Sequence, residues 1–264
     1  MTIKYTFLGL LIYVVIAAYL LAFLATLLGR KKTGHSLYLA GFIIAAITFG
    51  YRWYDAHHVP FQNLFEVFLS MGMLVYPLSI FCRRSLRVGG ETMDMLLGAL
   101  LLFPAGFIFK AEPQKLPPAL QSWLFIPHVA VYLMSYVIMA KATVQAVCQL
   151  KAKPGYADEN LVNPENGTYR IICFGFPLLT LGLILGSWWG KLAWGDYWGW
   201  DPKELWSLAS WLVYIGYLHF RYMFGKKHAR INSCLAILGM SVILITLLWA
   251  NLSKIFPGLH NYAS

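Results

Sequence analysis

Long apolar stretches recur along the whole of this 264-residue sequence, and they constrain its fold more than any other feature. Apolar residues make up 59% of the chain and charged residues 12%, against roughly 25% charged in an ordinary soluble domain. Each stretch has about 18 residues or more, enough for a helix to cross the hydrocarbon core of a bilayer. The connections are too short to contain a soluble domain of about 100 residues. The sequence therefore predicts a membrane protein and excludes soluble globular, disordered and collagen-like proteins.

The stretches are predicted to be helices, because a β-barrel would show short alternating segments instead of continuous apolar runs. We expect an all-α, polytopic transmembrane bundle of about eight spans, forming a single integral membrane domain over residues 1–264. The first stretch is interpreted as a genuine span, because it is too long for a cleavable signal peptide and lacks a basic flank. The predicted spans are Tyr5–Leu28, Leu37–Tyr54, Phe61–Phe81, Thr92–Phe109, His128–Leu150, Tyr169–Trp189, Leu205–Phe224 and Ile231–Ala250.

Basic residues are distributed unequally between alternate connections. Thirteen Lys and Arg residues lie on one side of the predicted spans and seven on the other. Cytoplasmic connections carry the excess of basic residues, so both termini and the Trp-rich loop at 190–204 are expected to face outward. Lys141 lies inside the fifth span and is expected to snorkel towards the cytoplasmic face. The net charge of +10 is thus explained by membrane orientation, and nucleic acid is not an expected partner.

Seven of the ten tryptophans lie between Trp188 and Trp211. An interfacial aromatic belt explains one or two tryptophans at each helix end. It does not explain the loop WGDYWGWDPKE, where glycines let the backbone turn between large rings. These rings suit a flat, apolar, aromatic ligand, with stacking contacts of about 1 kcal/mol each, and simple membrane anchoring is the alternative. The candidate ligand-binding rings of the loop are Trp194, Tyr197, Trp198 and Trp200.

The loop ends in Asp201-Pro202-Lys203-Glu204 and leads directly into an apolar helix. An acidic residue before a proline, with Glu204 in the first turn, is typical of a helix start. We expect Asp201 to cap this helix, and a direct role in ligand binding stays open beside the cap.

Three of the seven histidines are candidate ligands of a haem iron. His219 lies within the seventh span, where a polar residue is costly and by default functional. The residues Leu208, Trp211, Ile215 and His219 share one helix face, although a hydrogen bond from His219 to a neighbouring helix is the alternative. His128 begins the fifth span and His260 follows the eighth. Both are predicted on the outer side, where two neutral imidazoles from different segments would hold a haem iron axially.

A second group of polar residues lies at the mouth of the third span: His57, His58, Pro60, Asn63 and Glu66. This group is expected to face outward. Glu66 is near the membrane boundary, so the sequence leaves open a buried acceptor or a snorkelling carboxylate.

The segment from Trp194 to His219, WGDYWGWDPKELWSLASWLVYIGYLH, resembles the Trp-rich WWD signature and transmembrane histidine of a known family. This is the CcsA/ResC-type membrane component of the system II cytochrome c biogenesis machinery. Similar elements lie at His128 (HVAVYLMSY) and His260 (PGLHNY), and the segment from His58 to Glu66 is similar to the family's early segment. The likeness extends over most of the chain.

The resemblance implies a subunit of a cytochrome c haem lyase, or holocytochrome c synthase. Such a protein carries haem b across the membrane and presents it outside for thioether attachment to the CxxCH segment of apocytochrome c. His128 and His260 would be the axial ligands beside the Trp-rich loop, and His219 would bind haem within the membrane. No side chain of the chain would act as a nucleophile. Trp211 and Asp201 complete the expected haem-binding set.

The family's synthase also contains a second, CcsB/ResB-like membrane subunit, which supplies another membrane histidine and a large external domain. This sequence has no counterpart to either, so the resemblance implies a partner chain that provides the ligand opposite His219. The expected location is the bacterial cytoplasmic (inner) membrane, with the site on the external or periplasmic face, and the thylakoid membrane is the alternative.

Three other functions fit parts of the pattern. A haem exporter would load a separate haem chaperone, and a b-type electron-transfer subunit would exchange electrons with a quinone. A transporter or scaffold would use the aromatic loop only as an anchor. Covalently attached haem distinguishes a synthase from all three, and a colourless purified protein would indicate the scaffold.

Overall fold

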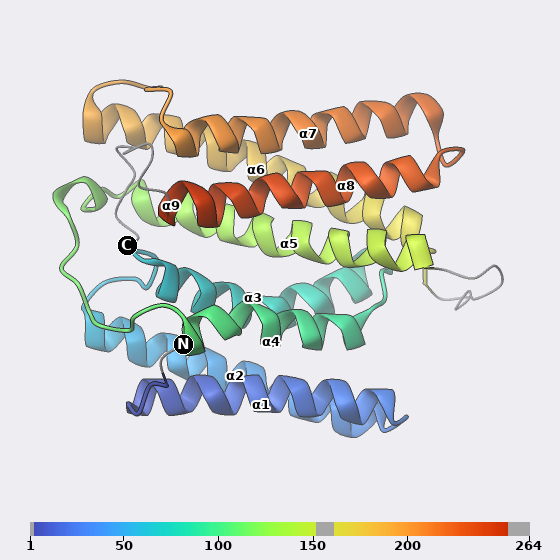
Figure 1. The fold of residues 1–264 in the computed structure, drawn as a ribbon, viewed down its shortest axis with the longest axis horizontal. Helices are drawn as coiled ribbons and strands as arrows, with labels where there is room; N and C mark the ends of the chain where they lie inside the picture. Colours follow the sequence, from blue (N-terminus) through green and yellow to red (C-terminus); the bar gives the residue numbers. More distant parts are fainter. Residues whose placement is uncertain (1–2, 152–160, 253–264) are drawn as a thin grey trace. The chain divides into compact units, whose positions relative to one another are not determined.

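The computed structural model describes residues 3–151 and 161–252, and every regular element in these two ranges is a helix (Figure 1). The prediction of an all-α fold is confirmed. Each predicted apolar span becomes a helix, because continuous apolar runs satisfy their backbone groups only within a helix. The long helices are α1 (Phe7–Leu27), α2 (Lys31–Ala56), α3 (Leu64–Ser85), α4 (Glu91–Phe107), α5 (Phe125–Lys151), α6 (Pro164–Trp194), α7 (Pro202–Phe224) and α8 (Ala229–Leu244).

Three short elements complete the described part of the chain. The 3₁₀ turn η1 (Pro118–Leu120) precedes α5. The π-helical segment η2 (Ile245–Trp249) and the short α9 (Ala250–Leu252) continue α8. The last predicted span is therefore an α-helix that widens into a π-helix.

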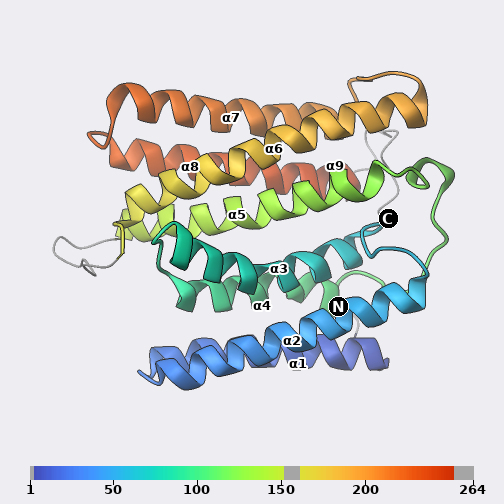
Figure 2. The same ribbon diagram turned by 180° about the vertical axis from the view of Figure 1, so that it is seen from behind.

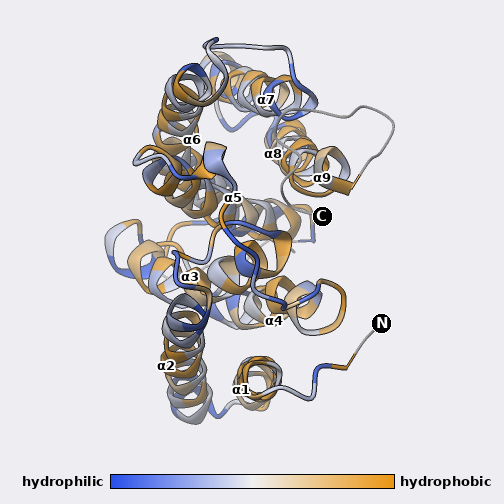
Figure 3. Cartoon of the chain, turned by 90° about the vertical axis from the view of Figure 1, so that its left-hand side faces the viewer, coloured by the Kyte–Doolittle hydropathy of each residue, from blue (hydrophilic) through white to orange (hydrophobic). Residues whose placement is uncertain are grey.

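Six helical segments within the described residues are long and apolar enough to cross a bilayer: α1, α2, α3, α5, α6 and the continuous segment Ala229–Trp249. The helix α4 has only 17 residues. Many large apolar side chains are exposed on these helices, which suits a lipid environment. Figure 3 colours the chain by hydropathy, and hydrophobic residues recur along the helices. Eight spans and the outward position of both termini stay predictions.

The chain packs as two compact units. The first contains residues 1–80 and 90–117, hence α1, α2, α4 and most of α3. The second contains residues 81–89 and 118–264, hence the end of α3 together with α5 and the helices that follow it. This division concerns packing inside each unit, and a single integral membrane domain over residues 1–264 stays a prediction.

In the first unit, the ring of Tyr19 on α1 packs against glycines of two other helices. A Cβ atom on Gly41 of α2 would lie 2.6 Å from this ring, and one on Gly98 of α4 would lie 2.7 Å from it. The Tyr19 hydroxyl donates to the carbonyl oxygen of Gly72 on α3 at 3.3 Å. Small residues allow close helix approach in membranes, so this buried ring joins all four helices of the unit.

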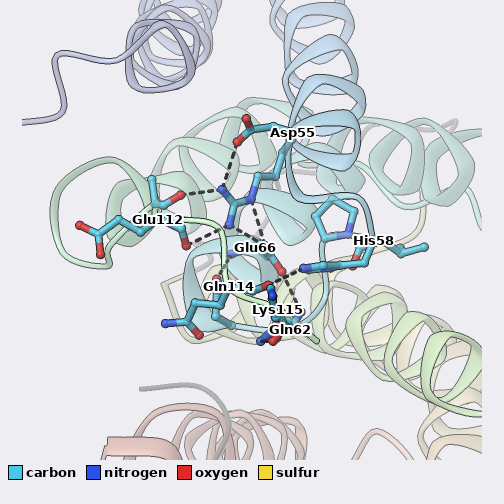
Figure 4. A network of polar contacts seen from close by, with 12 residues as sticks. Asp55, His58, Gln62, Glu66, Glu112, Gln114 and Lys115 are labelled. Atoms are coloured by element: carbon cyan, nitrogen blue, oxygen red, sulfur yellow. Dashed lines mark hydrogen bonds and ion pairs between the residues drawn. The ribbon is translucent and has the colours of Figure 1, made fainter. Parts of the chain in front are cut away.

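A buried ion pair joins α2 and α3 (Figure 4). Arg52 Nε and Nη2 lie 2.9 and 2.7 Å from Glu66 Oε1, and both side chains are 0% exposed. The other carboxylate oxygen accepts from the backbone N–H of Gln62 at 2.8 Å. Glu66 is therefore a buried acceptor, and the snorkelling alternative is wrong.

The same network holds the extended segment that follows α4. Arg52, His58 and Gln62 reach this segment from α2 and the α2–α3 connection (Figure 4). They contact the backbone carbonyl oxygens of Ala111, Glu112, Gln114 and Lys115. A stretch without regular structure is thus fixed by donors that the sequence places at 52–62.

In the second unit, α5, α6, α7 and α8 form a four-helix bundle (Figures 1 and 2). The helix α5 packs against α6 and α8, and α7 packs against the same two helices. At one end an ion pair joins three helices: Arg221 Nε lies 2.6 Å from Glu165 Oε1, and Asn232 Nδ2 donates to the same oxygen at 2.9 Å. We call Glu165, Arg221 and Asn232 the end cluster.

Lys141 of α5 points towards the α3–α4 connection, which is predicted to be cytoplasmic. Its side chain is only 3% exposed, and its ammonium group donates to the carbonyl oxygen of Gly89 at 3.3 Å. The direction agrees with the expected snorkelling. The charge nevertheless lies against a backbone carbonyl and not in water.

We predict that Glu66→Ala lowers the free energy of unfolding by about 3–5 kcal/mol, because it leaves the buried Arg52 guanidinium uncompensated. The matched control is Glu112→Ala, whose carboxylate is exposed and whose backbone carbonyl alone joins the network. That change should stay within about 0.5 kcal/mol. Equilibrium unfolding in mixed micelles, followed by circular dichroism, measures both. Equal losses in the two variants would contradict the role of the ion pair.

Candidate functional site

His128 lies in the first turn of α5, on a glycine-lined face of α6. Its Nδ1 atom is 3.0 Å from the carbonyl oxygen of Gly182, and a Cβ atom on Gly186 would lie 2.5 Å from its Cε1. A carbonyl oxygen can only accept, so Nδ1 carries the proton and Nε2 of the neutral imidazole carries the lone pair. Histidines that bind metal ions are usually oriented by such a bond to a carbonyl. His128 is therefore set up as an Nε2 ligand.

Aromatic rings surround this histidine. Trp189 stacks on it with 5.7 Å between ring centroids, and Tyr132 meets it edge-on at 5.1 Å. Trp194 packs against Trp189 at 4.8 Å, and Trp189 Nε1 donates to the carbonyl oxygen of Ala119 at 3.0 Å. The structure thus brings Trp194 and His128 into one cluster through Trp189.

Sequence reasoning missed the position of Trp189 in this cluster. The signal is present in the spacing of Gly175, Gly182, Gly186 and Trp189, which places all four on one face of α6. The helix also extends to Trp194, five residues beyond the predicted end of the span, so Trp194 lies in the last turn of α6 and not in the loop.

The loop between α6 and α7 is tied to the start of α7. The Asp201 side chain accepts from the backbone N–H of Lys203 at 2.8 Å. Glu204 Oε2 accepts from the backbone N–H groups of Asp201 and Gly199 at 3.1 and 2.8 Å. This reciprocal capping box confirms the prediction that Asp201 is the helix cap.

Lys203 lies in the first turn of α7, ahead of the predicted span. Burial lowers the pKa of Lys203 to about 8, and the nearby Asp201 carboxylate raises it in part. Strongly shifted lysines mark candidate functional positions. Lys203 is one of the seven basic residues on the predicted outer side, and its burial cannot be seen in the sequence of a loop.

Tyr197 and Trp198 face a different side of α6. They line a groove of about 530 Å³ together with Leu183, Ile184, Ser187, Trp188 and Leu208. Residues of a helix two positions apart are about 200° apart around its axis, so Ile184 and Trp188 lie opposite the face that contacts His128. The four loop aromatics therefore do not form one shelf beside His128. Trp200 is 65% exposed and has a left-handed backbone with φ 56°.

His219 and Trp211 on α7 also point in different directions. Trp211 Nε1 donates to Thr180 Oγ1 of α6 at 3.0 Å, so its partly buried ring packs against α6. His219 is exposed, and its Nδ1 lies 2.8 Å from the carbonyl oxygen of Ile215 in the same helix. The bond again gives Nδ1 the proton and leaves the lone pair of a neutral imidazole on Nε2.

His260 lies outside the described residues, so its convergence with His128 stays a prediction. Within residues 3–151 and 161–252, no three His, Cys, Asp or Glu side chains are grouped to hold a metal ion.

We predict that Gly186→Ala displaces His128 and lowers the free energy of unfolding by about 1–3 kcal/mol, because the new Cβ would overlap the imidazole. Gly216→Ala is the matched control, since nothing lies within 4 Å of a Cβ at that exposed position of α7. It should stabilise the helix by about 1 kcal/mol. Thermal unfolding of the purified variants tests the pair, and a stabilising Gly186→Ala would disprove the close contact.

Removing the cap of α7 by Asp201→Ala should lower the free energy of unfolding by about 1 kcal/mol. Asp201→Asn keeps an accepting oxygen for the Lys203 N–H and should retain most of the stability. The two variants are compared in the same detergent by thermal unfolding. A large loss in Asp201→Asn as well would show that the negative charge, beyond the cap, stabilises this region.

Comparisons with known proteins agree with this architecture. The family model described as "Cytochrome C assembly protein" matches residues 57–257. The chain is 32% identical to the "Cytochrome c biogenesis protein CcsA" of Synechococcus sp. (strain JA-3-3Ab), with 85% of this chain and 84% of the relative aligned. It is also 32% identical to the protein of the same description from Guillardia theta, with 87% and 85% aligned.

A solved structure described as "Cytochrome c Heme Lyase CcmF" has the same fold, with a TM-score of 0.68 and 20% sequence identity. The alignment covers 94% of this chain and 48% of that protein, so the chain spans about half of its length. The match over residues 57–257 contains both described candidate histidines, His128 and His219. The protein thus belongs to the cytochrome c assembly protein family.

Proposed function

We propose that the chain is the membrane component of a cytochrome c synthase, which carries haem b across the membrane and presents it at an external site for attachment to apocytochrome c. Membership of the cytochrome c assembly family supports this assignment, as do the relatives described as cytochrome c biogenesis proteins. The observation that carries it is the orientation of His128, whose Nδ1 contacts the Gly182 carbonyl so that Nε2 is the ligand atom.

In this proposal His128 is one axial ligand of the haem iron and His260 is the other. Trp189 and Trp194 form the aromatic wall beside His128, and aromatic contacts of this kind suit a porphyrin. Trp194 stays on the His128 side of α6 because it lies in the last turn of that helix and packs against Trp189. The capping box of Asp201 and Glu204 holds the loop that follows. Tyr197, Trp198 and Trp200 then contribute through the outer groove and surface of the loop.

His219 is proposed as the ligand of a second haem position within the membrane. The exposed stripe of α7 that carries it also contains Leu205, Leu212 and Gly216. A partner helix from a CcsB/ResB-like subunit would pack on this stripe and supply the opposite ligand. Trp211 keeps the stripe in place by its bond to α6.

The bound haem supplies the vinyl groups that react with the cysteine thiols of a CxxCH segment to form thioethers. The residues of this chain bind and orient the reactants and exclude water, which lowers the barrier through positioning. No side chain of the chain is required as a nucleophile. The activity is therefore that of a haem lyase subunit that works by holding two partners together.

The proposed site lies on the external face of a bacterial cytoplasmic membrane. The Synechococcus relatives make the thylakoid membrane the alternative location. Both locations place the CxxCH substrate on the side to which the positive-inside rule assigns residues 190–204.

The test is the absorption spectrum of the purified chain, co-expressed with its partner subunit and an apocytochrome c. We expect a low-spin haem spectrum and covalent haem on the apocytochrome. His128→Ala should abolish both the external low-spin signal and covalent product, because the orienting bond and the ligand are lost together. His219→Ala should lower haem content, and His260→Ala should resemble His128→Ala.

The matched control is His35→Ala, since His35 is an exposed histidine of α2 in the first unit. It should leave spectrum and product unchanged. A wild-type protein that is colourless, or that binds haem without producing covalent cytochrome c, would contradict the proposed synthase. Haem transferred instead to a separate chaperone would indicate an exporter.

A further inference from the structure

The inward face of α7 has an unusual composition for a helix in an apolar bundle. Its buried residues are Ser207, Ser210, Tyr214 and Tyr217, and all four carry a hydroxyl group. Inward positions of helices are usually filled by aliphatic residues. The spacing of three and four residues continues to Arg221 of the end cluster, so the polar groups form one continuous line along the helix. We call these four residues the hydroxyl stripe.

Two of these hydroxyl groups need a partner. Tyr214 and Tyr217 are both 0% exposed, and neither phenol oxygen has a hydrogen-bond partner among the described residues. The Oδ1 atom of Asn232, a residue that is 1% exposed, has none either in that part of the chain. Buried polar groups without partners cost free energy, most of all where lipid surrounds the helices. Ordered water is the usual partner for such groups.

Water is the usual partner of a buried hydroxyl that no protein group reaches. Ser210 already donates to the carbonyl oxygen of Ser207 at 2.7 Å. Tyr214 and Tyr217 are therefore the positions of the stripe that require bridging waters. A water chain would thus give the orphaned phenol oxygens of Tyr214 and Tyr217 their partners.

The stripe lies between two groups of polar side chains. At one end Tyr217 lies within electrostatic reach of Glu165 and Arg221 in the end cluster. At the other end Ser207 lies within hydrogen-bonding reach of the Tyr132 and Tyr136 phenols of α5. The Tyr132 ring contacts the imidazole of His128 at 5.1 Å between centroids. Polar groups therefore run from a carboxylate at one end of the bundle to a histidine near the other.

We propose that the hydroxyl stripe holds a chain of water molecules inside the α5–α8 bundle, and that this chain conducts protons between the end cluster and the Ser207 end of the stripe. Each water or hydroxyl accepts a proton on one side and releases another on the other side, so charge is conserved along the line. The water chain does not rest on the proposed function.

The first test detects the water directly and needs no variant. Brief X-ray irradiation of the full-length protein in detergent generates hydroxyl radicals from bound waters, and mass spectrometry locates the modified side chains. Tyr214 and Tyr217 should be modified although they are buried. Tyr19 is equally buried but donates to the Gly72 carbonyl, so it should stay unmodified. Labelling of Tyr214 and Tyr217 as low as that of Tyr19 would overturn the proposal.

The second test measures proton movement in liposomes that contain the full chain and a pH-sensitive dye. An imposed pH gradient should decay faster with the wild-type protein than in empty vesicles, and Tyr214→Phe should remove this difference. Tyr222→Phe is the control on the same helix, because Tyr222 is 87% exposed, and it should behave as the wild type. A wild-type decay equal to that of empty vesicles would contradict proton conduction.

Thermal unfolding of Tyr214→Phe tests whether the Tyr214 hydroxyl binds water. If it does, the substitution removes one hydrogen-bond partner of a bound water, and the Tm of the protein falls or stays constant. A rise in Tm would mean that the hydroxyl is dry and would overturn the proposal. None of the three measurements uses haem. Negative results would therefore contradict the water chain but not the proposed synthase. Loss of the haem spectrum would contradict the synthase but not the water chain.

Discussion

The close contact between α5 and α6 is the constraint on which the candidate site depends. Cβ atoms at Gly175, Gly182 and Gly186 would lie 2.8, 3.0 and 2.5 Å from side-chain atoms of α5. Apolar burial gives little drive to helix association in lipid, so close packing and hydrogen bonds decide which helices meet. Glycines at these positions bring the α6 backbone near enough for its carbonyl to orient His128. The same approach lets Trp189 stack on the imidazole.

The helix α7 has two faces with opposite character. Its outward face is apolar apart from His219, whereas its inward face carries the hydroxyl stripe. This inversion explains why α7 is not among the segments that hydropathy identifies as spans. A helix of this kind is stable only inside a bundle that satisfies its inward groups, since lipid offers no hydrogen bonds.

Each unit also contains a buried ion pair with additional donors. Glu66 accepts from Arg52 and from a backbone N–H, and Glu165 accepts from Arg221 and Asn232. Moving both charges out of water cancels much of their attraction, so such pairs contribute less to stability than their distances suggest. Their effect is geometric, because a carboxylate with several donors fixes the helix ends and segments that supply them. The Arg52 pair fixes the segment after α4, and the Arg221 pair fixes the start of α6 against α7 and α8.

The sequence by itself determined the all-helical architecture, the positions of the eight long helices and the Asp201 cap, because apolar runs and capping residues act within a few positions of the chain. It also placed His128 at a helix start and Trp194 near it. Only the tertiary structure decided that Tyr197 and Trp198 face away from His128, that Trp189 stacks on it, and that Arg52 is the partner of Glu66. The physical reason is that side-chain direction in a loop and contacts between distant residues depend on how the helices approach one another. That approach depends on packing at glycines such as Gly186, whose effect is visible only when both helices are in place.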